Sequence, residues 1–344
     1  MADMAEAQPA GNPSAELIGM MLGFLESRAI CVAAELGLAD LLAGGARTVE
    51  ELAAATATRP ELLRRLLRTL ASREVFAEEP DGTFVLSARA EPLRSDAPAS
   101  VRDYALFLGQ PFVQRPWEEL AGSLRTGQPG FDLLYRARLF EYLAANPADG
   151  AIFNNAMSSI TSREADAVIA AYDFTAFGRI VDIAGGHGGL LTAVLASSPA
   201  ATGVLFDLPQ VIAIATAVTR DRGVAGRCEL VSGDMFTAVP PGGDAYILKR
   251  TLHDWDDDRA AGILRNCRDA MNSGGRILIV DMVVPAGNEP HPSKHYDLMM
   301  MVMLGGRERT EEEFAALLAA AGLDLARIIP TRSPVSIIEA VRPQ

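Results

Sequence analysis

The stretch GRIVDIAGGHGG, residues 178–189, decides the fold of the C-terminal half of this 344-residue chain. Its first part is a short run of mostly apolar and β-branched residues, which is typical of a buried strand. Four glycines then occur within five positions, and the apolar helical run LLTAVLA comes directly after them. A turn without bulky side chains lets a ligand approach the backbone N–H groups at a helix N-terminus. The stretch therefore predicts a strand, a ligand-binding turn and a helix.

The rest of the C-terminal half continues this alternation of strand and helix. Further runs with the character of strands are TGVLFD, CELVSGD, DAYILK, GRILIVD, LARIIP and VSIIEAV. The alternation predicts an α/β fold in which helices cover both faces of a parallel sheet. Because ligands of open sheets bind beyond the carboxyl ends of the strands, the residues that follow each strand are the candidates for a site.

Two of these strand ends predict a nucleoside ligand. The second strand ends in Asp207, about 20 residues beyond Gly186, where a carboxylate can accept hydrogen bonds from both ribose hydroxyls. The third strand ends in GDMF, residues 233–236, which offers a carboxylate for an exocyclic amine and apolar side chains for a purine face. Neither the dinucleotide spacing G-x-G-x-x-G nor the P-loop spacing is present, so a pyrophosphate is not indicated.

The N-terminal half has a different pattern, which predicts helices and a β-hairpin. From Ala15 to about Gly45 apolar residues recur at helical spacing around almost the whole circumference, which favours contact with a partner chain. Within residues 48–87, Thr48 and Glu51 have the spacing of a capping box, and a second helix is expected from Arg59. The turn PDG then predicts a hairpin. Two helices and a hairpin make a winged-helix unit.

These patterns divide the chain into four parts. We expect a disordered tail in residues 1–14 and the winged-helix unit in residues 15–100. Residues 101–172 are expected to form a helical linker that contributes to the substrate pocket, and residues 173–344 the α/β domain.

The net charge of −13 argues against nucleic acid and membrane surfaces as partners, since both are polyanionic. Between Arg47 and Arg94 eight arginines are balanced by eight acidic residues, so the winged-helix unit lacks the basic footprint of a DNA reader. The longest segment without charged residues, 183–206, contains glycines and a proline and does not predict a membrane span. Three widely spaced cysteines fit neither a disulfide framework nor a zinc site, so we expect a cytoplasmic protein.

The stretch KRTLHDWDDD, residues 249–258, places His253 between a strand and a block of acids. This histidine could be a metal ligand, a general base or a bystander beside a helix start. The acids at 256–258 precede a clear helical run, where carboxylates satisfy free N–H groups and the helix dipole without a metal. A neutral imidazole with a pKa near 6.5 is suited to take a proton from a phenol with a pKa near 10. From these residues alone the alternatives stay open.

Six motifs in a fixed order carry a resemblance to a known family. They are IVDIAGGHGG, FDLP, GDMF, LKRTLHDWDD, IVDMVVP and GGRERTEEEF. Over nearly its whole length the chain resembles the S-adenosylmethionine-dependent O-methyltransferases of the caffeic acid and acetylserotonin (hydroxyindole) type, in the bacterial secondary-metabolite branch. The resemblance implies an α/β fold with a doubly wound Rossmann-like methyltransferase sheet, preceded by an all-helical winged-helix dimerisation domain. It also implies S-adenosyl-L-methionine as the cofactor, an aromatic small-molecule acceptor, and a homodimer formed through the N-terminal domain.

The resemblance further implies roles for individual residues. His253 would be the general base, and its ring would be steadied by Asp281, where Glu is more usual, and by Glu308. Asp207 would hold the ribose and Lys249 the methionine end of the cofactor. The full set of implied cofactor-binding residues is Asp182, Gly185, Gly186, Asp207, Leu208, Gly233, Asp234, Met235, Phe236, Lys249, Arg250 and Trp255. No metal is expected. One departure is Ala184, which stands where the family usually has a third glycine.

The methionine-rich run DLMMMVML, residues 297–304, is ambiguous. Its periodicity alone favours core packing, because methionine fills irregular gaps. The resemblance instead places this run and the FNNAM stretch, residues 153–157, at the acceptor site. The implied acceptor-site residues are Phe153, Asn154, Met157, Asp254, Met299, Met300 and Met303.

Two other functions compete with methyl transfer. Some relatives keep this fold and cofactor but carry out hydroxylation or decarboxylation on polyketide-like substrates, and a winged helix also occurs in ligand-sensing regulators. The complete set of His253, Asp281 and Glu308 favours methylation, and the acidity of the chain disfavours DNA binding.

Overall fold

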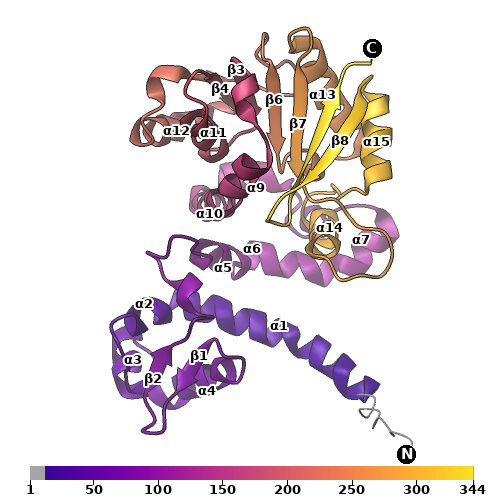
Figure 1. Cartoon of the computed structure of the whole chain (residues 1–344). Helices are drawn as coiled ribbons and strands as arrows, with labels where there is room; N and C mark the ends of the chain where they lie inside the picture. The colour runs from indigo at the N-terminus through magenta and orange to yellow at the C-terminus, as the bar shows by residue number, and fades with distance from the viewer. Residues whose placement is uncertain (1–11, 344) are drawn as a thin grey trace, which may run out of the picture. The chain divides into compact units, whose positions relative to one another are not determined.

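The chain divides into two compact units, Met1–Gln110 and Pro111–Gln344, in a computed structural model that describes residues 12–343 (Figure 1). The elements of the first unit are α1 (Pro13–Glu35), α2 (Leu38–Leu42), α3 (Val49–Thr56), α4 (Pro60–Ala71), β1 (Phe76–Glu78), β2 (Phe84–Leu86) and α5 (Arg102–Leu108). Helix α1 begins inside the segment 1–14 that the sequence assigned to a tail, and the rest of that segment lies outside the described residues.

The winged-helix unit forms as its sequence predicts, with one correction. Thr48 and Glu51 make both bonds of the capping box at the start of α3. β1 and β2 pair antiparallel, and Gly82 in the turn between them has a φ of +83°, a conformation that glycine adopts without strain. The expectation of an all-helical domain is therefore wrong, because the hairpin contributes two strands. Several of its arginines are paired with acids, as in Arg64–Glu78 at 2.9 Å.

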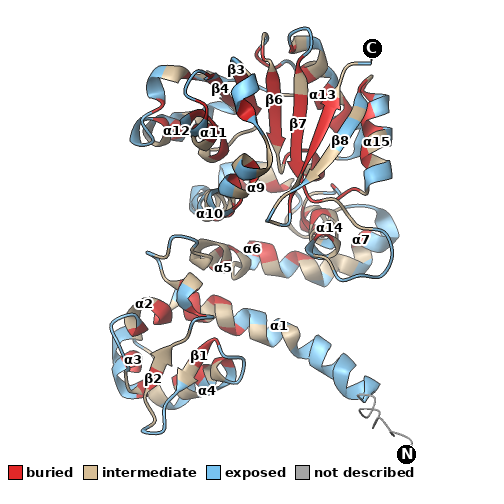
Figure 2. Cartoon of the chain, viewed as in Figure 1, coloured by how far each residue is buried: buried red, intermediate tan, exposed pale blue. Residues whose placement is uncertain are grey.

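Helix α1 has two parts that differ in burial (Figure 2). Its C-terminal part packs into the core of the first unit through residues such as Ala29, Ala33 and Ala34. Its N-terminal part exposes large apolar side chains, namely Leu17, Ile18, Met20, Met21, Leu22, Phe24 and Leu25. By length and composition α1 could cross a membrane, and within residues 12–343 it is the one helix with these properties. The exposed part is an apolar surface that nothing within its own unit covers.

The second unit is built on a seven-stranded sheet in the order β5-β4-β3-β6-β7-β9-β8. Its strands are β3 (Arg179–Ile183), β4 (Thr202–Asp207), β5 (Cys228–Ser232), β6 (Ala245–Lys249), β7 (Arg276–Asp281), β8 (Asp324–Pro330) and β9 (Ser336–Val341). The first five strands are parallel, as predicted, whereas β9 pairs antiparallel with both β7 and β8. A short loop joins β8 to β9 without a helix, and such a connection makes antiparallel neighbours.

Helices cover both faces of this sheet. They are α11 (Gly189–Ser197), α12 (Pro209–Asp221), α13 (Asp257–Ala270) and α15 (Glu311–Ala320). Ile180 of β3 packs with α11 in one apolar layer, and the next residue, Val181, packs with α13 in the other. Burial on both faces explains why this strand is a continuous apolar run. The order of the strands reverses between β3 and β6, which is where ligands of doubly wound sheets bind.

The helices that precede and interrupt the sheet lie at its carboxyl edge. They are α6 (Pro111–Gln114), α7 (Leu120–Thr126), α8 (Gly130–Tyr135), α9 (Leu139–Ala145), α10 (Pro147–Ala171) and α14 (Pro292–Met303) (Figure 1). Lys249 at the end of β6 forms an ion pair with Glu164 of α10. The backbone N–H of Glu308 donates a hydrogen bond to the carboxylate of Asp297 of α14. The predicted helical segment 101–172 is helical, and it is divided between the two units at residue 110.

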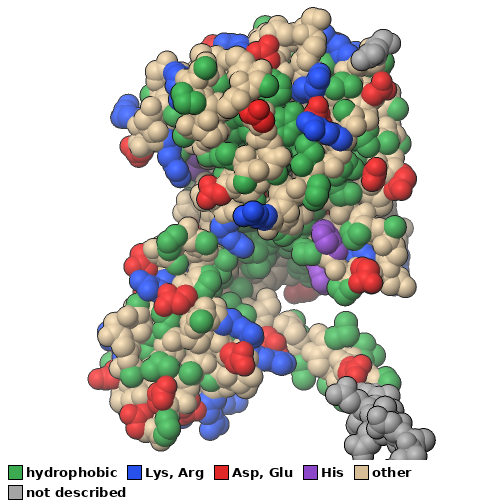
Figure 3. Space-filling model, in the orientation of Figure 1, with side chains coloured by type: hydrophobic (Ala, Val, Ile, Leu, Met, Phe, Trp, Pro, Cys, Tyr) green, Lys and Arg blue, Asp and Glu red, His purple; other side chains and the backbone are tan. Residues whose placement is uncertain are grey.

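On the face shown in Figure 3, basic side chains are interspersed with acidic ones rather than gathered in a patch of one charge.

Candidate functional site

The glycine loop after β3 has a backbone that few side chains allow. Gly186 and Gly188 have φ angles of +59° and +80°, in the left-handed region. A Cβ on Gly185 would lie 2.6 Å from the carboxylate of Asp182, too close for any other residue. Ala184 adopts a φ of +53°, so it holds the left-handed conformation at the position where the family usually has glycine.

Two carboxylates lie beside this loop. Asp207, at the end of β4, accepts hydrogen bonds from the N–H groups of Gly186 at 2.8 Å and Leu208 at 2.7 Å, and burial raises its pKa. Asp182, at the end of β3, is buried, and neither of its oxygens has a hydrogen-bond partner among the described residues. Burial, together with the charge of Asp207, raises the pKa of Asp182 to about 7 even though Lys249 opposes the shift. Buried acceptors without donors suit a cationic ligand with N–H and O–H groups.

The end of β5 contributes apolar side chains beside these carboxylates. Asp234 accepts a hydrogen bond from the N–H of Phe236 at 2.9 Å, and Met235 packs against the core. The ring of Phe236 meets that of Trp255 edge-on with centroids 4.8 Å apart. The indole N–H of Trp255 is buried without a partner in the described part of the chain. A Cβ on Gly233 would overlap the ring of Phe206, so the strand end admits only glycine there.

Lys249 and Arg250, at the end of β6, form a buried charge cluster with Glu164 of α10. Glu164 lies 2.8 Å from the ammonium of Lys249 and 2.6 Å from the guanidinium of Arg250, which also lies over the ring of Tyr296. Burial opposes ionisation of Glu164, but the two cations outweigh it and lower its pKa to about 2. Thr161 binds Lys249 at 3.2 Å. Burial lowers the pKa of Lys249, and Glu164 opposes that shift. With both basic side chains charged the cluster carries one net positive charge, which suits a ligand carboxylate.

His253 lies in a buried cluster of three carboxylates. Its Nδ1 is 2.8 Å from Glu308 and 4.0 Å from Asp281, and its Nε2 is 3.4 Å from Asp254. Burial disfavours the charged imidazolium, but Asp281, Glu308 and Asp254 outweigh burial and raise the pKa of His253 to about 9. The pKa of His253 thus lies above the reference value near 6.5 of a free imidazole. The three residues implied for acid–base chemistry are brought together.

The acids that follow His253 have structural partners. Asp256 caps α13 by accepting a hydrogen bond from the N–H of Arg259 at 2.9 Å, and Asp257 pairs with Arg309 at 2.8 Å. Within residues 12–343 no group of three or more His, Cys, Asp or Glu side chains has the arrangement of a metal site.

Apart from Asp254, which lies beside His253, the residues implied for the acceptor site lie on α10 and α14. Phe153, Asn154, Met157 and Met299 are half-buried, whereas Met300 and Met303 are buried and fit the core-packing alternative equally well. Phe140 of α9 lies 6.1 Å from the ring of Phe153 and 6.1 Å from the ring of Trp255. Aromatic side chains thus run from the acceptor side to the end of β5.

Sequence reasoning missed Glu164, Thr161 and Phe140. Each lies in a stretch with a helical pattern, where an acid or a threonine is typical of a solvent-exposed position and an aromatic residue is typical of the core. One available signal was Lys249 itself, since an ammonium that follows a buried strand needs an acidic partner.

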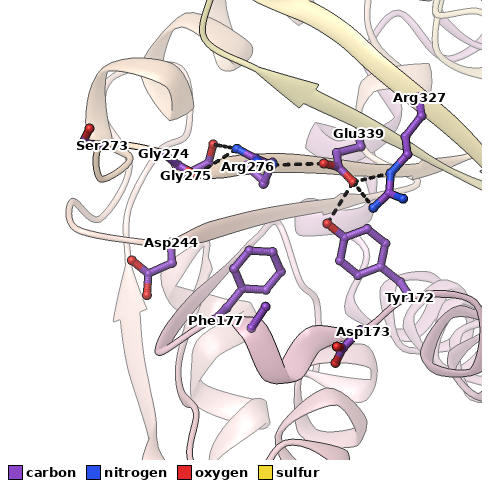
Figure 4. A pocket seen from close by; sticks show the side chains of 11 residues that line it. Tyr172, Asp173, Phe177, Asp244, Ser273, Gly274, Gly275, Arg276, Arg327 and Glu339 are labelled. Atoms are coloured by element: carbon purple, nitrogen blue, oxygen red, sulfur yellow. Dashed lines mark hydrogen bonds and ion pairs between the residues drawn. The ribbon is translucent and has the colours of Figure 1, made fainter.

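A cavity of about 510 Å³ lies at the opposite, amino edge of the strands (Figure 4). Its charged groups pair with one another. Glu339 accepts a hydrogen bond from the hydroxyl of Tyr172 at 3.0 Å and forms ion pairs with Arg276 and Arg327 at 3.0 and 2.9 Å. Because these charges are matched internally, the site described above is the stronger candidate.

Comparisons with known proteins find related enzymes over almost the whole chain. A family model described as an O-methyltransferase domain matches residues 117–324, and one described as an O-methyltransferase dimerisation domain matches residues 18–94. Phenazine O-methyltransferase from Lysobacter antibioticus is 44% identical over 95% of this chain and 96% of its own length. A mitomycin biosynthesis 6-O-methyltransferase from Streptomyces lavendulae is 40% identical over 94% of this chain and 93% of its own.

A solved structure adds ligands to the comparison. An O-methyltransferase from neocarzinostatin biosynthesis, crystallised with S-adenosylmethionine and 2-hydroxy-5-methyl naphthoic acid, superposes with a TM-score of 0.79 at 36% identity. The match covers 92% of this chain and 96% of that one.

Proposed function

Because this chain belongs to the O-methyltransferase family and uses S-adenosylmethionine, we propose that His253 removes the proton from a phenolic hydroxyl group of an aromatic acceptor as that group is methylated. The relatives support methyl transfer rather than hydroxylation or decarboxylation, and an enzyme rather than a ligand-sensing regulator. The acceptor that we propose is a flat natural-product intermediate, in line with the naphthoic acid held by the related enzyme.

The bond between Nδ1 of His253 and Glu308 carries the proposal. At 2.8 Å it fixes the ring, and Nδ1 is best assigned as the protonated nitrogen because a carboxylate accepts there. Nε2 is then the nitrogen that faces an acceptor. Asp254, 3.4 Å from Nε2, is placed to accept a second hydrogen bond from the same acceptor.

The proposed cofactor residues fit the donor chemically. Asp182 supplies a buried acceptor for an ammonium group and Asp207 a half-buried acceptor for ribose hydroxyl groups. Trp255 would border the adenine, and the cluster of Lys249 with Arg250 offsets a carboxylate. When bound, S-adenosylmethionine supplies an electrophilic methyl group on a positively charged sulfur.

The chain's own task is alignment and proton transfer. As the acceptor oxygen forms its bond to the methyl carbon, the carbon–sulfur bond breaks and the hydroxyl proton passes to Nε2 of His253. Glu308 and Asp281 stabilise the resulting imidazolium by charge. The proton then leaves to solvent, which restores the base.

We also infer a homodimer formed through the first unit. All of the exposed apolar side chains of α1 except Leu17 lie within the residues that match the dimerisation domain, and burying them against a second copy would be favourable by about 25 cal/mol per Å². The net charge of −13 supports a cytoplasmic enzyme without nucleic acid or membrane partners.

The test replaces His253 with Gln. Cofactor affinity measured by calorimetry should stay near that of the wild type, while turnover should fall by roughly 10²–10⁴, the usual effect of losing a general base. A panel of phenols and hydroxyquinones can be assayed by release of S-adenosylhomocysteine. His295→Gln, at an exposed position, is the matched control and should leave turnover unchanged. Wild-type turnover by the His253→Gln variant would refute the assignment, as would an activity that EDTA abolishes and Mg²⁺ or Zn²⁺ restores.

A further inference from the structure

We propose that Arg309 is a positioning residue that holds the turn carrying His253 in its reactive place, an inference that rests on the proposed role of His253. The side chain of Arg309 is 1% exposed and is the largest of the fully buried side chains. A buried guanidinium must satisfy its donors within the protein. Its partners therefore define what it does.

Two of these partners are backbone carbonyl groups on either side of His253. Nη1 of Arg309 donates to the carbonyl oxygen of Leu252 at 3.0 Å, and Nη2 donates to that of Trp255 at 3.0 Å. Leu252 directly precedes the histidine and Trp255 follows it by two positions. One planar group thus holds both ends of a four-residue turn.

The charge of the Arg309 guanidinium is paired with an exposed carboxylate and not with one of the carboxylates around His253. Nε and Nη2 bind one carboxylate oxygen of Asp257 at 3.0 and 2.8 Å, and the Asp257 side chain is 58% exposed. The fixed fork of the guanidinium reaches one carboxylate and two carbonyls at once, which the single ammonium of a lysine cannot do.

The residues that precede Arg309 in the sequence form hydrogen bonds with the same turn. The N–H of Arg307 donates to the carbonyl oxygen of His253 at 2.9 Å, and the carboxylate of Glu308 binds its ring. A Cβ on Gly306 would overlap that carbonyl oxygen. Residues 306–309 therefore hold His253 by its backbone, its ring and its flanks.

Arg309 also connects this turn to the strand that ends in Asp281. Its own carbonyl oxygen accepts a hydrogen bond from the N–H of Val284 at 2.9 Å, three positions beyond that carboxylate. A shift of Arg309 would thus alter the distances from His253 to Glu308 and Asp281 together. These distances determine both the direction in which Nε2 points and the pKa of the imidazole ring.

The experiment compares Arg309→Lys with Asp257→Asn. Lysine cannot hold both carbonyls, so kcat should fall roughly 10- to 100-fold through misplacement of His253, while KM and cofactor affinity change less than fivefold. Asp257→Asn leaves both carbonyl bonds in place and should retain kcat within about threefold.

The second readout is the titration of the His253 ring by NMR without any substrate. The chain has four histidines, and His253→Gln identifies the signal. In Arg309→Lys the pKa of His253 should move down from its raised value because the carboxylates recede. A change confined to stability would leave this titration and the pH profile of kcat where they are.

If Arg309→Lys does not fold, Gly306→Ala displaces the same turn from the other side and should give the same loss of kcat and the same shift. Wild-type kcat with an unchanged titration in Arg309→Lys overturns the proposal, as does an equal loss in Asp257→Asn. A shifted titration combined with full turnover in His253→Gln would refute the role of His253 and leave the positioning intact.

Discussion

The proposed cofactor side of the strand edge, with Asp182 and Asp207, and the proposed base side, around His253, both contain carboxylates that are largely shielded from solvent. The two sides differ in what these carboxylates face. In the described structure the carboxylate of Asp182 has no hydrogen-bond partner, and that of Asp207 accepts hydrogen bonds from two backbone N–H groups. A ligand could therefore donate further hydrogen bonds to this side. On the base side Asp281 and Glu308 already face the imidazole of His253. The first side should respond to pH through its acids, and the second through its histidine together with Asp281 and Asp254, whose pKa values burial raises to about 7 and about 6.

The largest expected effect is on the base side. Glu308→Gln should lower kcat about 100-fold, because an amide neither holds Nδ1–H as a carboxylate does nor stabilises the imidazolium. In the wild type the rate should rise with pH and level off near the pKa of about 9, since the base must lose its proton first. In the variant the levelling should occur at lower pH, because a carboxylate that raises the pKa of His253 is gone. Glu311→Gln, exposed on α15, should change neither quantity.

A smaller effect is expected on the cofactor side. Asp207→Ala should weaken S-adenosylmethionine binding at least tenfold, since about 1.5 to 3 kcal/mol is lost with a charged hydrogen bond. At saturating cofactor kcat should be preserved, in contrast to Glu308→Gln. Calorimetry on Asp207→Ala, with the exposed Asp221→Ala as control, checks both statements. Unchanged affinity would remove Asp207 from the site.

The pH dependence of cofactor binding sharpens the contrast further. With its pKa raised to about 7, Asp182 is largely protonated at pH 6 and must lose that proton to pair with a cation. Affinity should therefore be roughly eightfold weaker at pH 6 than at pH 7.5. Asp182→Asn should remove this slope, whatever its effect on the affinity itself. A slope that persists in the variant would assign the titration to another group.

The smallest effect concerns the loop itself. Ala184→Gly should raise stability by up to about 1 kcal/mol, because the left-handed conformation strains alanine and not glycine. Cofactor affinity should change less than threefold. Ala57→Gly is a matched control, since Ala57 also has a positive φ, of +52°, but lies at the end of α3. Urea denaturation of both variants should give similar gains, and a large change of affinity in Ala184→Gly alone would show that the alanine shapes the site.

The cofactor side could be predicted from the sequence because its parts are local. The loop of residues 184–188 follows its strand directly, and Asp207 ends the next one, so parallel pairing of β3 with β4 brings them together. The capping box of Thr48 and Glu51 was equally visible, since three positions define it.

The base side depends on contacts that no local pattern encodes. Glu308 is 55 positions from His253, and only the family resemblance connected the two. From the sequence, Glu164 is expected on the surface of a helix and Arg309 on the surface of a loop. Both are buried and form ion pairs in the structure. The raised pKa of His253 escaped prediction for the same reason, because it depends on how many carboxylates the fold brings to one ring. The antiparallel pairing of β8 and β9 likewise follows from a connection, not from their composition.

The burial of Lys249 gives the molecule a built-in chemical reporter. The sequence holds two lysines, Lys249 and Lys294, and the ammonium of the first is enclosed by Glu164 and Thr161. An acylating reagent applied under native conditions should modify Lys294 quickly and Lys249 only when α10 separates from the end of β6. The rate of the slower acylation, followed by mass spectrometry, would therefore report how often α10 separates from the end of β6. Few other amines in the protein would compete for the reagent.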